Sequence, residues 1–199
     1  ISSVLNNLVL GGLLAVVILF VFLKNIKPTI IIALSIPISL LFAVAMMYFS
    51  GVTMNVISLA GLALGVGMLV DNSIVVIENI YRLRNEGMGI KKAAVQGASQ
   101  VAGAIVASTL TTICVFLPIV FTDGLSRQLF TDMGLTIAYS LIASLIVALT
   151  LVPTISSKVL TNLDEKEHGL FDRFVNFYEG LLRKALRYKW GVLGAVAIL

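Results

Sequence analysis

Charged side chains are scarce in this sequence of 199 residues. Asp, Glu, Lys and Arg together make up 12% of the chain, whereas a soluble domain carries about 25% charged residues. Hydrophobic residues make up 59%, and the mean hydropathy is +1.05. This composition excludes an ordinary soluble domain and predicts a polytopic membrane protein.

Cysteine and histidine are almost absent. The single cysteine, Cys114, lies inside an apolar run, so it permits no intrachain disulfide bond and no cysteine-based metal site. The single histidine, His168, lies in a charged linker, where we expect it to be solvated. No nucleophile and base stand at a catalytic spacing, and no second acid stands at a metal-ligand spacing. The sequence therefore predicts no metal, no cofactor and no enzyme.

Long apolar runs occupy most of the chain. A helix that spans a membrane needs about 20 mostly apolar residues, and five runs reach that length. We expect these spans at residues 4–23, 29–49, 56–80, 101–121 and 129–152. The predicted fold class is therefore all-α, a polytopic transmembrane helix bundle with five full spans and the start of a sixth. The same pattern predicts a short amphipathic surface helix at 90–100 and an end to the fifth span at Pro153.

A different pattern follows the fifth span. Residues 163–169 form a polar linker, and apolar residues then recur at spacings of three and four through 170–186. This period predicts an amphipathic helix that lies flat in the cytoplasmic membrane interface. We expect three parts in the chain: a transmembrane bundle at 1–157, a cytoplasmic linker and amphipathic helix at 158–189, and the start of a further span at 190–199.

Basic residues mark one side of the membrane. If the spans alternate in direction, the linkers at 24–28, 81–100 and 158–189 share one side, and they hold every Lys and Arg except Arg127. The positive-inside rule makes this side cytoplasmic. The net charge of +4 is thus explained by membrane orientation, and no nucleic-acid partner is expected.

One acid lies well inside the third span. Asp71 is roughly a turn past its middle, where an aspartate costs at least about 2.5–3.5 kcal/mol on insertion scales. Such an acid is functional by default, and we expect it to point into the helix bundle and to carry a proton. The alternative is a buried acid that bonds to a neighbour and never titrates. No Lys or Arg lies within the spans, so any countercharge would come from outside this chain. Glu78 is close enough to the cytoplasmic end to be solvated.

The residues around Asp71 are small or polar. Gly61 and Gly65 form a pair at the spacing that lets another helix come close, and Gly67 is grouped with them as a packing residue. Two interpretations of Asn72 are open: it belongs to the proton relay with Asp71, or it forms an interhelical hydrogen bond, which we favour. The glycines lack the Gly-Lys-Ser/Thr ending of a phosphate-binding loop.

Four hydroxyl residues in the fourth span also have two readings. They either line a polar path or donate back to their own helix, the commoner arrangement. These residues are Ser108, Thr109, Thr111 and Thr112.

The run GVGMLVDNSIVVIENI at residues 65–80 resembles the fourth transmembrane helix of the resistance–nodulation–division (RND) transporters, and is closest to the hydrophobe/amphiphile efflux branch. VFLP at 115–118 resembles the end of that family's fifth helix, and LTLVP at 149–153 the end of its sixth. Residues 170–187 resemble the cytoplasmic helix between its two halves. The resemblance implies a membrane-domain fragment covering helices two to six and the beginning of seven.

The resemblance also implies a function. Members of the family are trimers in which proton movement through the membrane part drives extracytoplasmic substrate domains. Asp71 matches a proton-carrying aspartate, whereas well-studied drug pumps have a second aspartate where this chain has Asn72. The implied function is proton-driven export of hydrophobic or amphiphilic compounds from the cytoplasmic (inner) membrane by a single-acid relay.

The implied partners are the lipid bilayer, the remainder of the same polypeptide, two further copies in a homotrimer, and adaptor and outer-membrane proteins. Heavy-metal, lipid and protein export by the same superfamily are alternatives. A structural membrane fragment without transport is another. The metal branch is disfavoured because the methionines do not share one helix face.

Overall fold

The computed structural model describes residues 2–23, 25–121, 124–160, 177–184 and 187–188. All regular structure in these ranges is helical, which confirms the predicted all-α class. The chain divides into two compact units, Ile1–Asn162 and Leu163–Leu199, which are described separately.

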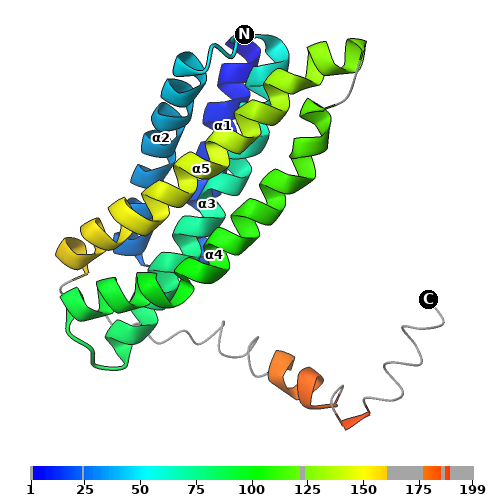
Figure 1. The fold of residues 1–199 in the computed structure, drawn as a ribbon. Coiled ribbons are helices and arrows are strands. Elements are labelled where there is room, and N and C mark those ends of the chain that lie inside the picture. Colours follow the sequence, from blue (N-terminus) through cyan, green and yellow to red (C-terminus); the bar gives the residue numbers. More distant parts are fainter. Residues whose placement is uncertain (1, 24, 122–123, 161–176, 185–186, 189–199) are drawn as a thin grey trace. The chain divides into compact units, whose positions relative to one another are not determined.

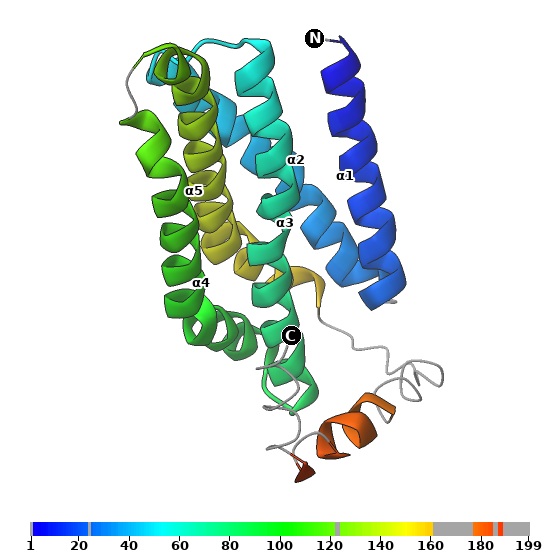
Figure 2. The same cartoon turned by 90° about the vertical axis from the view of Figure 1, so that its right-hand side faces the viewer.

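The first unit is a bundle in which each helix runs antiparallel to the one before it (Figures 1 and 2). Its helices are α1 (Ser2–Leu23), α2 (Ile26–Phe49), α3 (Val56–Asn85), α4 (Ile90–Val120) and α5 (Leu125–Val159). Among these described helices, α3 alone contacts all four others. The helix that carries Asp71 is therefore the centre of the bundle.

Four of the described helices are long and apolar enough to cross a membrane. These spans are Ile26–Phe49, Val56–Asn85, Ile90–Pro118 and Phe130–Val159. The first expected span forms α1, a helix of 22 residues. The bundle thus has the helices that were predicted, with α1 the shortest of them.

Helix α3 continues five residues past the predicted end at Ile80. Its last turn carries two arginines, whose charge is favourable near the carbonyl end of a helix. The helix stops where Gly87 takes a left-handed conformation with φ +90°, which a side chain would strain. The Met88 N–H then donates to the Leu83 carbonyl over 3.2 Å, and the Gly87 N–H to Arg84 over 3.1 Å.

Helix α4 joins two segments that were expected to be separate, the surface helix at 90–100 and the span at 101–121. It bends after its first turns, which lie across one end of the bundle (Figures 1 and 2). The bend is held against α3, because the Asn79 side-chain amide donates to the Gly97 carbonyl over 2.8 Å. A Cβ on Gly97 would lie 2.9 Å from the Ile80 Cα, so only glycine permits this approach.

Helix α5 corrects the prediction that Pro153 closes the fifth span. Pro153 lies inside the helix, which runs on to Val159. Proline removes one backbone donor, and membrane helices tolerate this loss when neighbouring segments pack around it. Here the following turn packs into the core: Ile155 and Val159 are partly buried against it, and Leu160 is fully buried.

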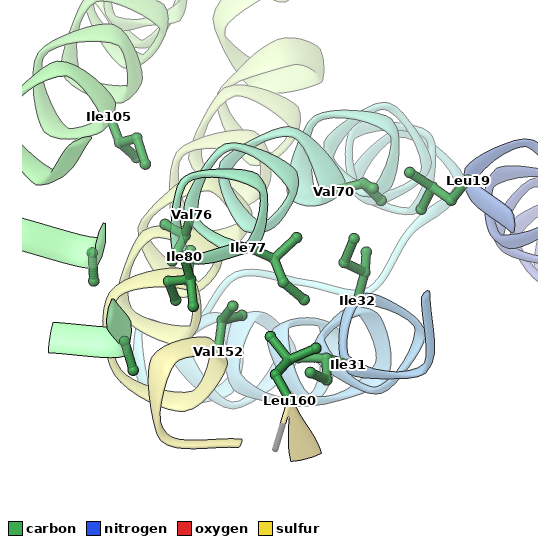
Figure 3. Close-up of a cluster of buried hydrophobic side chains, with 13 residues drawn as sticks. Leu19, Ile31, Ile32, Val70, Val76, Ile77, Ile80, Ile105, Val152 and Leu160 are labelled. Carbon is green, nitrogen blue, oxygen red and sulfur yellow. The ribbon is translucent and has the colours of Figure 1, made fainter. Parts of the chain in front are cut away.

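The core of the bundle draws side chains from every helix. Its buried members include Leu19, Ile31, Ile32, Val70, Val76, Ile77, Ile80, Ile105, Val152 and Leu160. Figure 3 shows Leu19 of α1 and Val70 of α3 pointing toward each other, on the side of α3 away from α4. The apolar contacts of α3 therefore fix which of its faces remain for polar groups.

The second unit contains part of the predicted amphipathic helix. Residues 177–184 are helical, and Arg183 forms an ion pair with Glu179 over 2.7 Å. Phe177, Tyr178, Leu181 and Leu182 are exposed apolar residues of this stretch. The rest of the predicted helix, the linker at 163–169 and the start of a further span at 190–199 lie outside the described residues.

Candidate functional site

Asp71 lies on an uncovered face of α3. Exposed residues recur along this helix at spacings of three and four: Leu64, Gly67, Asp71, Val75 and Glu78. We call these five the open stripe. The other described helices pack against the remaining sides of α3. Among the described helices Asp71 is exposed and lines a cleft with residues of α4, while the neighbouring positions on α3 take up the contacts with α2, α4 and α5. The expectation that Asp71 points into the complete helix bundle stays a prediction.

The Asp71 carboxylate has no protein partner in the described part of the chain. No hydrogen bond or ion pair from the described residues reaches it. This matches the absence of Lys and Arg from the predicted spans. The carboxylate is therefore not locked to a permanent partner within this bundle.

Asn72, the next residue, faces the interior and is 9% exposed. Its side-chain amide donates to the Thr109 hydroxyl of α4 and to the Ser144 hydroxyl of α5, over 3.4 Å in each case. Of the two predicted readings, the structure contains the interhelical hydrogen bond. Ser73 is buried on a third side, where its hydroxyl accepts from Ser35 of α2 over 3.2 Å.

Two of the three predicted packing glycines bring α3 and α5 together. A Cβ on Gly61 would lie 2.9 Å from the Met133 carbonyl oxygen, and a Cβ on Gly65 would lie 2.8 Å from the Ser140 Cβ. Gly67 differs, since a Cβ there would meet nothing within 4 Å among the described residues. Gly67 belongs to the open stripe beside Asp71, so it packs against none of the described helices, and its packing role stays a prediction.

A polar cleft lies beside Asp71, between α3 and α4. It has a volume of about 290 Å³. Its lining consists of Met68, Asp71 and Asn72 from α3, Ser108, Thr109 and Thr112 from α4, and Leu141 from α5. Three of the four hydroxyl residues of the fourth span thus meet at the acid, whereas Thr111 does not line the cleft.

The two readings of these hydroxyls are both present. Ser108 donates to the Ile105 carbonyl over 3.0 Å, and Thr112 donates to the Ser108 carbonyl over 2.9 Å. Each therefore bonds back to its own helix and lines the cleft as well. The arrangement places one carboxylate, without a partner among the described residues, beside several hydroxyl oxygens.

A second acid, Asp132 of α5, binds the residues just before the N-terminus of α3. The sequence did not single it out. Its carboxylate accepts from the Thr53 hydroxyl over 2.7 Å and from the Asn55 side-chain amide over 3.0 Å. The Asn55 side chain also accepts from the backbone N–H of Ser58 over 2.8 Å and so caps α3. The Asn-x-x-Ser spacing was the only signal for this cap, and nothing in the sequence linked it to α5.

The described residues contain no group of three His, Cys, Asp or Glu side chains that would hold a metal ion.

Comparison with known proteins gives relatives over the whole chain. The pattern of the AcrB/AcrD/AcrF family matches residues 1–199. The chain is 36% identical over 208 residues to the swarming motility protein SwrC of Bacillus subtilis, covering 100% of this chain and 20% of that protein. It is 35% identical over 159 residues to the multidrug resistance protein MdtC of Pectobacterium atrosepticum, covering 80% of this chain and 16% of the relative. The MdtC protein of Pectobacterium carotovorum is 34% identical over 159 residues, with the same coverage. The chain thus spans a fifth or less of the length of these relatives.

Proposed function

This chain belongs to the AcrB/AcrD/AcrF family of the RND superfamily, and from that premise we propose that it forms part of the membrane domain of a proton-driven efflux pump in which Asp71 carries the proton. Membership makes it a multi-pass membrane segment of a transporter rather than an enzyme. The proton role, the substrate class and the partners belong to the proposal.

The proposal rests on one observation: no hydrogen bond or ion pair from the described residues reaches the Asp71 carboxylate. A proton carrier has to bind and release its proton in turn, so it must not be held by a permanent ion pair or a fixed set of donors. Asp71 meets this condition within the described bundle and opens on a cleft lined by hydroxyls. An acid that served only the packing of these helices would be bonded as Asn72 is.

The open stripe supports the view that further protein covers Asp71. Lipid cannot solvate a carboxylate or supply a countercharge, so a membrane acid faces protein or water. The relatives are about five times longer than this chain. We propose that the remainder of the polypeptide packs on the open stripe and supplies the basic partner of Asp71 in one state of the transport cycle.

The proposed relay uses one acid. The position after Asp71 is occupied by an amide that cannot take up a proton at neutral pH, and that amide is already bonded to α4 and α5. Asn72 therefore serves the geometry of the site, and Asp71 alone exchanges the proton.

The proposed substrates are hydrophobic or amphiphilic compounds, which is supported by the multidrug resistance names of two relatives. We further propose a homotrimer in the cytoplasmic (inner) membrane that works with adaptor and outer-membrane proteins. Lys or Arg residues lie at the end of α3, at the start of α4 and at the end of α5. These helix termini lie together at one end of the bundle (Figure 1), which is the arrangement expected of a cytoplasmic face.

The test uses the full-length parent protein with Asp71→Asn, which keeps size and polarity but cannot carry a proton. We expect proton-coupled efflux to fall by about 100-fold or more, the usual scale for loss of an acid–base group. Glu78→Gln is the matched control, because Glu78 lies on the same stripe but near the end of the span. It should leave efflux near the parental value. Parental efflux by Asp71→Asn, at normal expression, would reject the proposal.

A further inference from the structure

We propose that the cleft between α3 and α4 holds the water through which protons reach and leave Asp71, and that Ser108 and Thr112 position this water. The inference rests on the proposed role of Asp71 as the proton carrier. It adds a route for the proton and assigns two positioning residues on a helix that does not carry the acid.

The cleft has the size and the lining that bound water needs. Its volume of about 290 Å³ exceeds the share of about 30 Å³ that one water occupies in the liquid several times over. A water in such a space also needs two to four polar partners. The Asp71 carboxylate, the hydroxyls of Ser108 and Thr112, and the Asn72–Thr109 pair provide them on neighbouring parts of the wall. An apolar cavity of this size would stay dry.

The hydrogen bonds of the two hydroxyls determine how they meet water. Each hydroxyl has one proton, and both Ser108 and Thr112 already donate it to a carbonyl of α4. Their oxygens therefore act toward the cleft only as acceptors. A water beside them donates one hydrogen to the hydroxyl oxygen and has the other free for the next water or for the carboxylate.

This orientation of the waters favours proton transfer along a chain of them. When an excess proton arrives, each water passes one proton to the next while it accepts one from the water before. The last water gives a proton to a carboxylate oxygen of Asp71, so one O–H bond forms there as one breaks on that water. The reverse sequence releases the proton, and no other reactant is required.

The remaining lining residues of the cleft are apolar and offer water no hydrogen bonds. Met68 and Leu141 contribute apolar surface, and Leu141 is almost fully buried against the bundle. Thr109 accepts from the Asn72 amide, so its replacement would also disturb the packing of α3. Ser108 and Thr112 are therefore the residues whose hydroxyls can be removed with least effect on the helices.

Thr111 provides a matched control within the same helix turn. Its hydroxyl donates to the Ala107 carbonyl over 2.8 Å, the same back-bond that Thr112 makes to Ser108. Thr111 is exposed but is not part of the cleft wall. Loss of the back-bond alone would thus affect Thr111 and Thr112 variants equally, whereas loss of bound water would affect only the latter.

The experiment compares Ser108→Ala, Thr112→Val, Thr112→Ser and Thr111→Val in the full-length parent, with Asp71→Asn as reference. Each protein is reconstituted in liposomes, and proton flux and substrate transport are followed together across a range of substrate concentrations. We expect Ser108→Ala and Thr112→Val each to lower the maximum rate about fivefold at unchanged KM, the effect of one lost hydrogen bond. Thr112→Ser should restore the rate, and Thr111→Val should not change it.

The outcomes separate the two proposals. If Asp71→Asn abolishes coupled transport while Ser108→Ala and Thr112→Val retain the parental rate, the water route is rejected and the proton carrier stands. An equal loss in Thr111→Val also rejects it, because the effect then follows the back-bond. If Asp71→Asn itself transports normally, both proposals fail. Should Thr112→Val express poorly, Ser108→Ala and Thr112→Ser still decide the question.

Discussion

Asp71 and Asn72 are consecutive residues of α3, yet Asp71 lies on the open stripe while Asn72 is 9% exposed and bonded to Thr109 and Ser144. Successive residues of a helix are about 100° apart around its axis, since a turn takes about 3.6 residues. One position can therefore hold three helices together while its neighbour stays free. This division separates the group that we propose to react from the group that fixes its place.

Replacement of Asn72 by alanine tests that division. Asn72→Ala removes two interhelical hydrogen bonds from a buried position, so we expect it to lower the free energy of unfolding by about 1–3 kcal/mol. The rate of coupled transport per folded molecule should be retained. Thermal unfolding in detergent measures the first effect, and reconstituted transport measures the second. A fully stable Asn72→Ala protein that has lost proton coupling would instead place Asn72 in the relay.

The close approach of α3 to α5 predicts that two glycines of the same helix respond oppositely to alanine. Gly61→Ala brings a methyl group against the backbone of Met133, and overpacking of this kind costs about 1–3 kcal/mol. Gly67→Ala meets open space in this chain and should raise stability by up to about 1 kcal/mol through helix propensity. Unfolding of the 199-residue chain in detergent compares the two. Equal effects would show that the contact with Met133 is not formed.

The bond between Thr53 and Asp132 predicts energetic coupling between the start of α3 and α5. Asp132→Ala removes the acceptor of two side-chain donors, and we expect a loss of about 1.5–3 kcal/mol, the scale for bonds to charged groups. Thr53→Ala removes one of those bonds. The double variant should therefore lose less than the sum of the two single losses, because both remove the same bond. Additive losses would indicate that the two side chains act independently.

The proposed orientation predicts which bundle end is reached from outside the cell. Ser50 ends α2 in the connection that leads into α3, and Glu86 follows the other end of α3; both are exposed. In a full-length Cys114→Ser background, an impermeant maleimide should label Ser50→Cys in intact cells. It should label Glu86→Cys only after the membrane is opened. The opposite pattern would invert the assignment made from Lys and Arg.

Much of the fold was predictable from local pattern. Apolar runs gave the helices and their order, and Asp71 stood out because a lone acid in a membrane span is unusual. The predictions that failed concerned where helices begin and end. Pro153 looked like a helix end, but the apolar residues after it pack into the core and continue α5. The surface helix at 90–100 looked separate, but α4 runs through it without a break.

The site was predictable in part. The spacing of Gly61 and Gly65 indicated a close helix contact, but their partner on α5 lies about 70 positions away in the sequence. Helical spacing also placed Gly67 near Asp71, without showing that this side of α3 is uncovered. The hydroxyls of α4 had two readings, and only their position beside Asp71 shows that three of them share its cleft.

Composition and period alone determined that this chain forms membrane helices, and they identified the acid that costs most to place there, because both depend on the transfer of single residues into lipid. Tertiary structure decided which side of α3 carries that acid and which helices bind its neighbours. It also decided that hydroxyls from α4 line the space beside it. These outcomes depend on how helices pack against one another, and helix packing brings together residues that the sequence keeps far apart.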